Sequence, residues 1–182
     1  LCGRCEGSKA IVPSPLYRGL SVISAPSDGG DVEAAPLGRL LAAMRPYFDF
    51  ILLDTAAGMG APFAAAATVA DTALIVLTPD PVALRDGRIV ADRLLRGGRP
   101  QSAVRLVMNR ITRESFGKRA AVFDLDECID TVGAQLLAVI PESRELQQAG
   151  AQGTVPPAHD PAVTAGQAMA RRLCGQRVPL TL

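Results

Sequence analysis

The segment FDFILLDTAAGMG (residues 48–60) contains residue types that could take part in nucleotide hydrolysis. An apolar run ends in Asp54, and a turn of small residues that includes Gly58 follows it. A carboxylate at the end of a buried strand must be solvated, paired or bound to a metal. The functional interpretation is an acid that holds Mg²⁺ directly or through water, beside a turn that senses a phosphate. The structural alternative is an aspartate that caps an ordinary strand-to-helix turn.

Two later runs end in residues that suit the base of a nucleotide. Asn109 and Arg110 follow the run VRLVM, and Pro141 and Glu142 follow LLAVI. A carboxamide can donate to and accept from one edge of adenine, and a guanidinium plane can stack on its ring. Pro141 and Glu142 would supply a backbone wall for the base. The alternatives are an Asx turn with a solvated arginine, and a turn in which Ser143 caps the next helix.

A charged helix is expected over residues 81–96, with Asp80 as its N-cap and Pro81 at its first position. Arg85, Asp86 and Arg93 belong to its polar face. A solvated face with pairs at i,i+3 and i,i+4 is the simpler interpretation. The more specific interpretation is a surface for a partner or for dimer contacts. The apolar side of this helix is expected to hold Val82, Ile89, Val90 and Leu94.

The elements that must position these residues alternate along the chain. Short continuous apolar runs, typical of strands buried on both faces, occupy residues 20–25, 50–54, 73–78, 104–109 and 135–140. Helical patterns occupy residues 33–46, 81–96, 122–133, 143–149 and 161–174. This alternation predicts a single α/β domain over residues 1–182 with a mostly parallel, doubly wound sheet. Such sheets bind ligands at the carboxyl ends of their strands, where the candidate residues lie.

Composition and motif spacing argue against several other functions. A net charge of +1 and an aromatic content of 4% argue against a specific nucleic-acid-binding surface. Cys2 and Cys5 have C-x-x-C spacing, but no second C-x-x-C completes a four-thiolate zinc site, so reduced cytosolic thiols are the simpler interpretation. The most apolar stretch, PFAAAATVADTALIVLTP, contains Asp71 and has proline near both ends, which argues against a transmembrane helix.

Taken together and in this order, the motifs resemble the MinD family of septum-site-determining ATPases, within the MinD/ParA group of deviant Walker A proteins. FDFILLDTAAGMG is similar to the family's Walker B motif and switch II, and the step at Arg85 and Asp86 is similar to the next helix. VRLVMNRI is similar to the adenine-side strand, and LLAVIPESRELQQAGAQGTVP is similar to the closing strand with its Pro-Glu step. The resemblance covers nearly the whole chain.

The resemblance implies an ATP- and Mg²⁺-dependent switch. It gives Asp54 the Walker B role, Gly58 the switch II role and Asn109 the adenine contact, and it places partner and dimer contacts on the 81–96 helix. It also implies a homodimer that recruits a division inhibitor and responds to a topological regulator. The expected location is the cytoplasm, with peripheral contact on the inner face of the cell membrane. The C-terminus ends in VPLTL rather than a Phe/Lys-rich helix, so this contact is expected to be weak or indirect.

One family motif does not occur in these 182 residues. The phosphate loop K-G-G-x-G-K-T is absent, and the chain's two lysines, Lys9 and Lys118, lie in unrelated surroundings. The 182 residues are therefore expected to be a fragment that lacks the first βαβ unit, to be unable to hydrolyse ATP, and to be unstable or to close the sheet differently. Two rivals stay open. One is a sister ATPase such as a flagellar-number regulator or a ParA-type partition protein, and the other is a non-catalytic binding module of this fold.

Overall fold

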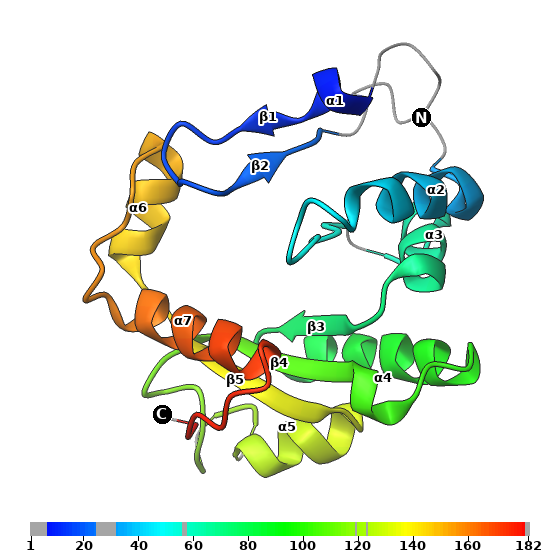
Figure 1. Cartoon of the computed structure of the whole chain (residues 1–182). Coiled ribbons are helices and arrows are strands. Elements are labelled where there is room, and N and C mark those ends of the chain that lie inside the picture. The colour runs from blue at the N-terminus through cyan, green and yellow to red at the C-terminus, as the bar shows by residue number, and fades with distance from the viewer. Residues whose placement is uncertain (1–6, 25–31, 56–57, 119, 123, 181–182) are drawn as a thin grey trace. The chain divides into compact units, whose positions relative to one another are not determined.

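A computed structural model describes residues 7–24, 32–55, 58–118, 120–122 and 124–180. It divides into two compact units, residues 1–71 and residues 72–182. The elements in chain order are α1 (Gly7–Ala10), β1 (Val12–Pro13), β2 (Ser21–Val22), α2 (Ala34–Met44), α3 (Ala61–Val69), β3 (Ala73–Leu77), α4 (Pro81–Arg96), a 3₁₀ turn (Gln101–Ala103), β4 (Val104–Ile111), α5 (Leu125–Val132), β5 (Gln135–Pro141), α6 (Arg144–Gln152) and α7 (Pro161–Leu173), as labelled in Figure 1.

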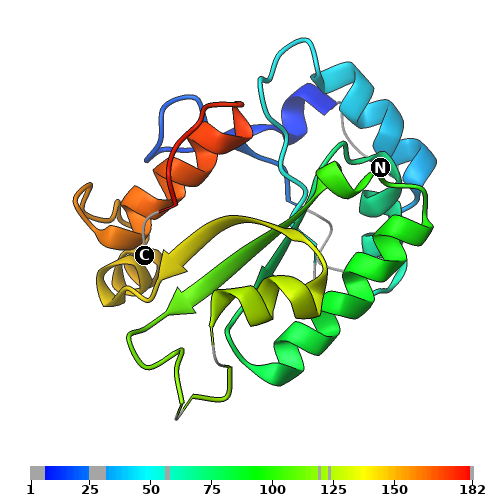
Figure 2. The same cartoon turned by 90° about the horizontal axis from the view of Figure 1, so that it is seen from below.

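The second unit has the predicted α/β architecture. Its three strands are parallel in the order β3-β4-β5. Helix α7 packs on β5, while α4 packs on β3 and on α5. Figure 2 shows the sheet between α7 on one side and α4 with α5 on the other. The arrangement confirms an α/β fold with a parallel sheet flanked by helices.

Local sequence explains where the helices of this unit begin and end. Asp80, Asp124 and Ser143 each accept a hydrogen bond from a backbone N–H in the first turn of α4, α5 and α6, at 2.9 Å in every case. These caps satisfy donors that the helix itself leaves free. Gly133 ends α5 with a φ of 72°, a left-handed conformation that favours glycine. The caps expected at Asp80 and Ser143 are confirmed.

The buried side of α4 differs from the one expected. Leu84, Gly87, Ala91 and Leu94 are buried, whereas Val82 is 70% and Ile89 44% exposed, so of the expected apolar side only Leu94 is fully buried. Gly87 lies on the buried side, against β3. A Cβ at this position would lie 2.3 Å from Leu77 Cδ1, so the glycine leaves room for that side chain where the helix approaches the strand. Apolar residues alone did not reveal this contact, because glycine carries no hydrophobic signal.

The first unit departs from the expected sheet. Residues 50–55 form no strand, and the run 20–25 contributes only Ser21–Val22, which pairs antiparallel with β1. Both strand predictions were therefore wrong, in existence for the first and in length and direction for the second. An apolar run becomes a strand only when a neighbouring strand satisfies its backbone groups. Leu52 is 79% exposed, so the run 50–54 also lacks the burial that was expected.

The first unit also contains a helix that the sequence pattern did not predict. Helix α3 follows Gly60, has proline in its first turn and contains a run of alanines, which have the highest helix propensity. It packs against α2, whose residues Leu37, Leu40, Leu41 and Met44 are buried or half-buried as expected. Nearly every residue of α3 is apolar, so no periodicity distinguished it from a strand. None of the described helices combines the length and apolarity needed to span a membrane.

Candidate functional site

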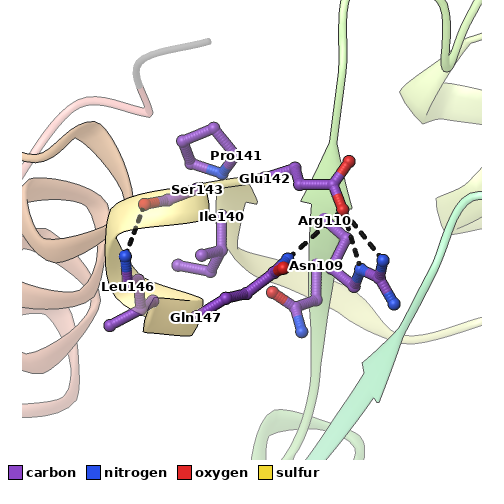
Figure 3. A pocket seen from close by; sticks show the side chains of 8 residues that line it. All are labelled: Asn109, Arg110, Ile140, Pro141, Glu142, Ser143, Leu146 and Gln147. Carbon is purple, nitrogen blue, oxygen red and sulfur yellow. Dashed lines mark hydrogen bonds and ion pairs between the residues drawn. The ribbon is translucent and has the colours of Figure 1, made fainter. Parts of the chain in front are cut away.

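A pocket of about 310 Å³ lies in the second unit, where β4 and β5 end and α6 begins. Figure 3 shows the eight side chains that line it. They are Asn109, Arg110, Ile140, Pro141, Glu142, Ser143, Leu146 and Gln147. The four residues that the sequence assigned to the base of a nucleotide are all among them. Their carboxyl-end position is where parallel α/β sheets bind ligands, and the volume is at the lower end of the range for small-molecule sites.

A β-bulge shapes one side of this pocket. Met108 pairs with Val139 and Ile111 pairs with Pro141, so β4 holds one more residue than β5 over this interval. Arg110, within the bulge, has a φ of 57° and is the one non-glycine residue of the described chain with a positive φ. Such a conformation is uncommon for arginine and persists where the surroundings hold it. Bulges re-aim side chains, and this one places Asn109 and Arg110 together at the pocket.

An ion pair fixes the conformation of Arg110. Its Nη2 and Nε donate to Glu142 Oε1 at 2.8 and 3.3 Å, and Gln147 Nε2 donates to the same oxygen at 3.4 Å. The hydrogen bond and charge of Arg110 lower the pKa of the Glu142 carboxyl below its usual value. The backbone N–H of Glu142 also donates to the carbonyl of Ile111 at 2.9 Å. Glu142 is therefore ionised at neutral pH. It follows β5 directly and connects that strand to β4 and to α6 at the pocket wall.

The remaining lining combines a free amide with apolar surface. Within the described residues the half-buried Asn109 side chain has no hydrogen-bond partner, and its amide lies beside that of Gln147 in Figure 3. Ile140, Pro141 and Leu146 supply apolar atoms around these amides. A flat ligand with hydrogen-bonding edges, such as a purine, matches this combination. No buried side-chain nitrogen or oxygen of the described residues is left without a partner.

A buried hydrogen bond between Ser143, which lines the pocket, and Asp160 connects the pocket to α7. Ser143 Oγ donates to Asp160 Oδ2 at 2.6 Å, and Asp160 Oδ1 accepts from the N–H groups of Ala162 and Val163 at the start of α7. The hydrogen bond from Ser143 is the main reason why the pKa of Asp160 is lowered. Asp160 is only 3% exposed. The first turns of α6 and α7 are thus joined through two capping side chains.

The candidate phosphate-side residues belong to the other unit. Asp54 is exposed, and Gly58 has a φ of 100°, which requires the conformational freedom of glycine. The pocket residues belong to residues 72–182, whereas Asp54 and Gly58 belong to residues 1–71. Their roles therefore stay predictions from the sequence.

The candidate partner surface lies on α4. Arg85, Asp86 and Arg93 are exposed, as the charged face predicted. On the same helix Arg88 and Arg96 pair with Asp92 at 3.0 and 3.7 Å, as i,i+4 pairs do on a solvated helix.

Only Cys128 and Cys174 of the four cysteines lie in the described part of the chain, and both are free thiols. Cys2 and Cys5 lie outside the described residues. Burial raises the pKa of the Cys128 thiol to about 11, so this residue behaves as part of the core. No group of three or more metal-binding side chains occurs in the described part of the chain.

Two polar residues of the site, Gln147 and Asp160, were missed by sequence reasoning. Gln147 reaches the pocket because it lies one helical turn after Ser143, on the side of α6 that faces Glu142. Asp160 precedes Pro161, and an aspartate before proline is a recognisable N-cap signal. That signal predicts the cap of α7, but the buried contact with Ser143 depends on tertiary structure.

Comparison with known proteins identifies relatives along the whole chain. The septum site-determining protein MinD of Bacillus subtilis (strain 168) is 31% identical over 185 residues, which is 98% of this chain and 68% of that protein. MinD of Helicobacter pylori is 28% identical over 96% of this chain and 68% of its own length. No protein-family model matches the chain.

Solved structures agree with these relatives. The MinD cell division protein of Aquifex aeolicus superposes with a TM-score of 0.84 at 29% identity, over 100% of this chain and 75% of that one. The MinC:MinD complex of the same organism gives 0.83 at 30%, over 99% and 73%. MinD of Pyrococcus horikoshii, solved with Mg-ADP, shares the fold, with a TM-score of 0.77 at 20% identity over 94% and 70%. The chain therefore belongs to the MinD family of septum site-determining cell-division proteins.

Proposed function

We propose that this protein is an ATP- and Mg²⁺-dependent switch that acts in selecting the division site. The observation that carries the proposal is the meeting of Asn109, Arg110, Pro141 and Glu142 in one pocket. These residues come from two strand ends that are 30 residues apart in sequence, and membership of the MinD family predicts an adenine site at that place. The Mg-ADP in the Pyrococcus protein supports nucleotide binding in the family.

The chemistry of the pocket matches adenine. The Asn109 amide can donate to one atom of the base edge and accept from its neighbour. The Arg110 guanidinium is held by Glu142 and can stack on the ring. The apolar atoms of Ile140, Pro141 and Leu146 can cover the rest of the base. These residues bind and orient the nucleotide and carry out no proton transfer.

We propose that the phosphate side uses Asp54 and Gly58. Mg²⁺ usually binds through one or two carboxylates together with phosphate oxygens and water, so a single Asp54 is a sufficient protein ligand, directly or through water. The ion would neutralise charge on the phosphates, and hydrolysis would be slow because no strong general base is expected. The left-handed Gly58 would let the turn follow the phosphate. The 182 residues by themselves would not hydrolyse ATP, because the phosphate loop does not occur among them.

We further propose a division-inhibitor partner, for which the MinC:MinD complex of Aquifex is the support. We also propose a homodimer, which follows from the resemblance to the family alone. Arg85, Asp86 and Arg93 on α4 would contact the partner or the second subunit, and a topological regulator would be a second partner. The protein would act in the cytoplasm, with weak or indirect contact to the inner face of the membrane. Arg172 donates to the carbonyls of Val178 and Leu137, so the segment after α7 is docked on the fold.

Nucleotide binding by the complete reading frame tests the proposal. ATP with Mg²⁺ should bind, and Asn109→Ala should weaken binding about tenfold because one hydrogen-bonded edge is lost. Gln101→Ala, an exposed amide outside the pocket, is the matched control. Asp54→Asn should reduce hydrolysis at least tenfold, whereas Asp49→Asn in the same segment should not. Failure of the unmutated protein to bind ATP would favour the non-catalytic binding module.

A further inference from the structure

We propose that Gln147, with its amide oriented by Glu142, is a specificity-determining residue that selects 6-aminopurine over 6-oxopurine nucleotides. The inference rests on the proposed nucleotide site. It begins with the three hydrogen bonds that converge on Glu142 Oε1, two from Arg110 and one from Gln147.

Glu142 orients the amide of the Gln147 side chain. An ionised carboxylate only accepts hydrogen bonds, so the contact with Glu142 must use the amide NH₂ of Gln147. Arg110 keeps Glu142 ionised and in place, because its guanidinium donates two hydrogen bonds to the same oxygen. The Gln147 amide therefore has one favourable orientation, with Nε2 toward Glu142 and Oε1 free for a ligand.

An amide oxygen of Gln147 held in one orientation can recognise a donor on the base. Gln147 and Asn109 line the same pocket, and in Figure 3 the Gln147 side chain points toward Asn109. A base placed against Asn109 could therefore meet the amide oxygen that Gln147 does not use toward Glu142. Adenine carries an amino group at position 6 and can donate to this oxygen. Hypoxanthine and guanine carry a carbonyl there, which would place two acceptors against each other. Polar sites built for a donor reject an analogue that lacks it, because a polar group is then left unpaired.

A free glutamine would not discriminate in this way. Rotation of its terminal amide exchanges donor and acceptor, so the same side chain could serve either purine. The discrimination therefore depends on Glu142, which holds the amide in one orientation. Asn109 lacks such a partner among the described residues, so it can adapt to either base and contributes affinity rather than selectivity.

The test is the ratio of affinities for Mg-ATP and Mg-ITP, which differ only at purine position 6 and the adjoining N1 proton, measured by calorimetry on the complete reading frame. Gln147→Leu should lower the ATP preference about tenfold. Glu142→Gln should lower it in the same direction by releasing the amide. Gln148→Leu, the neighbouring exposed residue that does not line the pocket, should leave the ratio unchanged.

The possible outcomes separate this inference from the proposed function. ATP binding with an unchanged ATP-to-ITP ratio in both Gln147→Leu and Glu142→Gln would overturn the role of Gln147 and leave the nucleotide site standing. A protein that binds neither nucleotide would overturn the proposed function, and the inference with it. A reduced ratio in both variants and a normal ratio in Gln148→Leu would support the inference.

Discussion

The two units of this chain bury their apolar residues to very different degrees. The first unit buries Leu41, Ala65 and Ala66, and every other buried apolar side chain of the described residues belongs to the second unit. Exposed large apolar residues follow the opposite distribution, with Leu52 at 79%, Val12 at 61% and Phe50 at 59% in the first unit. Hydrogen-bonded strand pairing accounts for the difference. The second unit has a three-stranded parallel sheet, whereas the first pairs only two residues of each short strand.

The comparison shows that apolar sequence specifies a strand only together with a partner. The runs 50–54 and 73–77 are similar in length and apolar character, yet only the second pairs with a neighbour and buries a core residue, Ile75. Buried backbone groups without hydrogen-bond partners cost free energy. An apolar run with no neighbouring strand to pair with is therefore more stable when its backbone is exposed to water. Two-residue strands add little stability of their own. The second unit is therefore expected to supply most of the resistance to unfolding.

The largest expected effect comes from opening the core of the second unit. Leu106 on β4 is fully buried, and Leu106→Ala should lower the free energy of unfolding by about 2–5 kcal/mol. Leu52→Ala is the matched change in the first unit and should alter it by less than about 0.5 kcal/mol, because Leu52 is exposed. Urea unfolding followed by circular dichroism measures both. Equal losses at the two positions would mean that residues 50–54 are packed in solution.

The next effect comes from the buried contact between α6 and α7. Ser143→Ala removes the N-cap of α6 and one donor to Asp160, and should cost about 1–2 kcal/mol of unfolding free energy. The loss should be largest at neutral pH. The lowered pKa of Asp160 stabilises the fold above the pKa of the unfolded chain, and this contribution disappears as pH falls through the folded-state value.

Measurement of unfolding at pH 7 and at pH 2–3 tests this prediction. The difference between the unmutated protein and Ser143→Ala should shrink as pH falls, because protonation of Asp160 removes the charge that the hydrogen bond from Ser143 stabilises. Ser102→Ala, an exposed serine in the 3₁₀ turn, is the control and should show neither effect. A pH-independent difference would mean that Ser143 acts only as a helix cap.

A smaller effect is expected where α4 approaches β3. Gly87→Ala would bring a Cβ to 2.3 Å from Leu77 Cδ1 and 3.3 Å from Leu77 Cγ, so the leucine or the helix must move. We expect a net loss of about 1 kcal/mol, since the packing cost exceeds the gain in helix propensity. Gly150→Ala on α6, whose Cβ would meet nothing within 4 Å, should be stabilising. Thermal melts should therefore shift in opposite directions, and two upward shifts would contradict the close approach.

These positions also show what the sequence could and could not predict. The three strands of the parallel sheet, the caps at Asp80 and Ser143, and the grouping of Asn109, Arg110, Pro141 and Glu142 at strand ends follow from local patterns and from the geometry of parallel sheets. The failures have non-local causes. Residues 50–54 form no strand because no neighbouring strand pairs with them. The buried side of α4 includes Gly87, where the helix contacts a strand residue. Gln147 is a different case, because its hydrogen bond to Glu142 is local and follows from its place one helical turn after Ser143.

The smallest effect concerns the ion pair of the first unit. Arg45 Nη2, at the end of α2, donates to both carboxylate oxygens of Asp71 at 2.9 and 2.8 Å, and the two side chains are 57% and 77% exposed. Exposed pairs of this kind contribute about 0–1 kcal/mol and are screened by salt. Arg45→Ala should therefore cost less than about 0.5 kcal/mol at low ionic strength and nothing measurable in 1 M NaCl.

Arg39→Ala on the same helix removes an exposed arginine for which the described residues provide no ion pair, and it is the matched control. If Arg45→Ala instead costs as much as Ser143→Ala, and does so at both ionic strengths, this contact must be shielded from solvent. The first unit would then hold its helices by a buried polar contact as the second unit does at Ser143 and Asp160. The contrast between the two units would be reduced to their sheets.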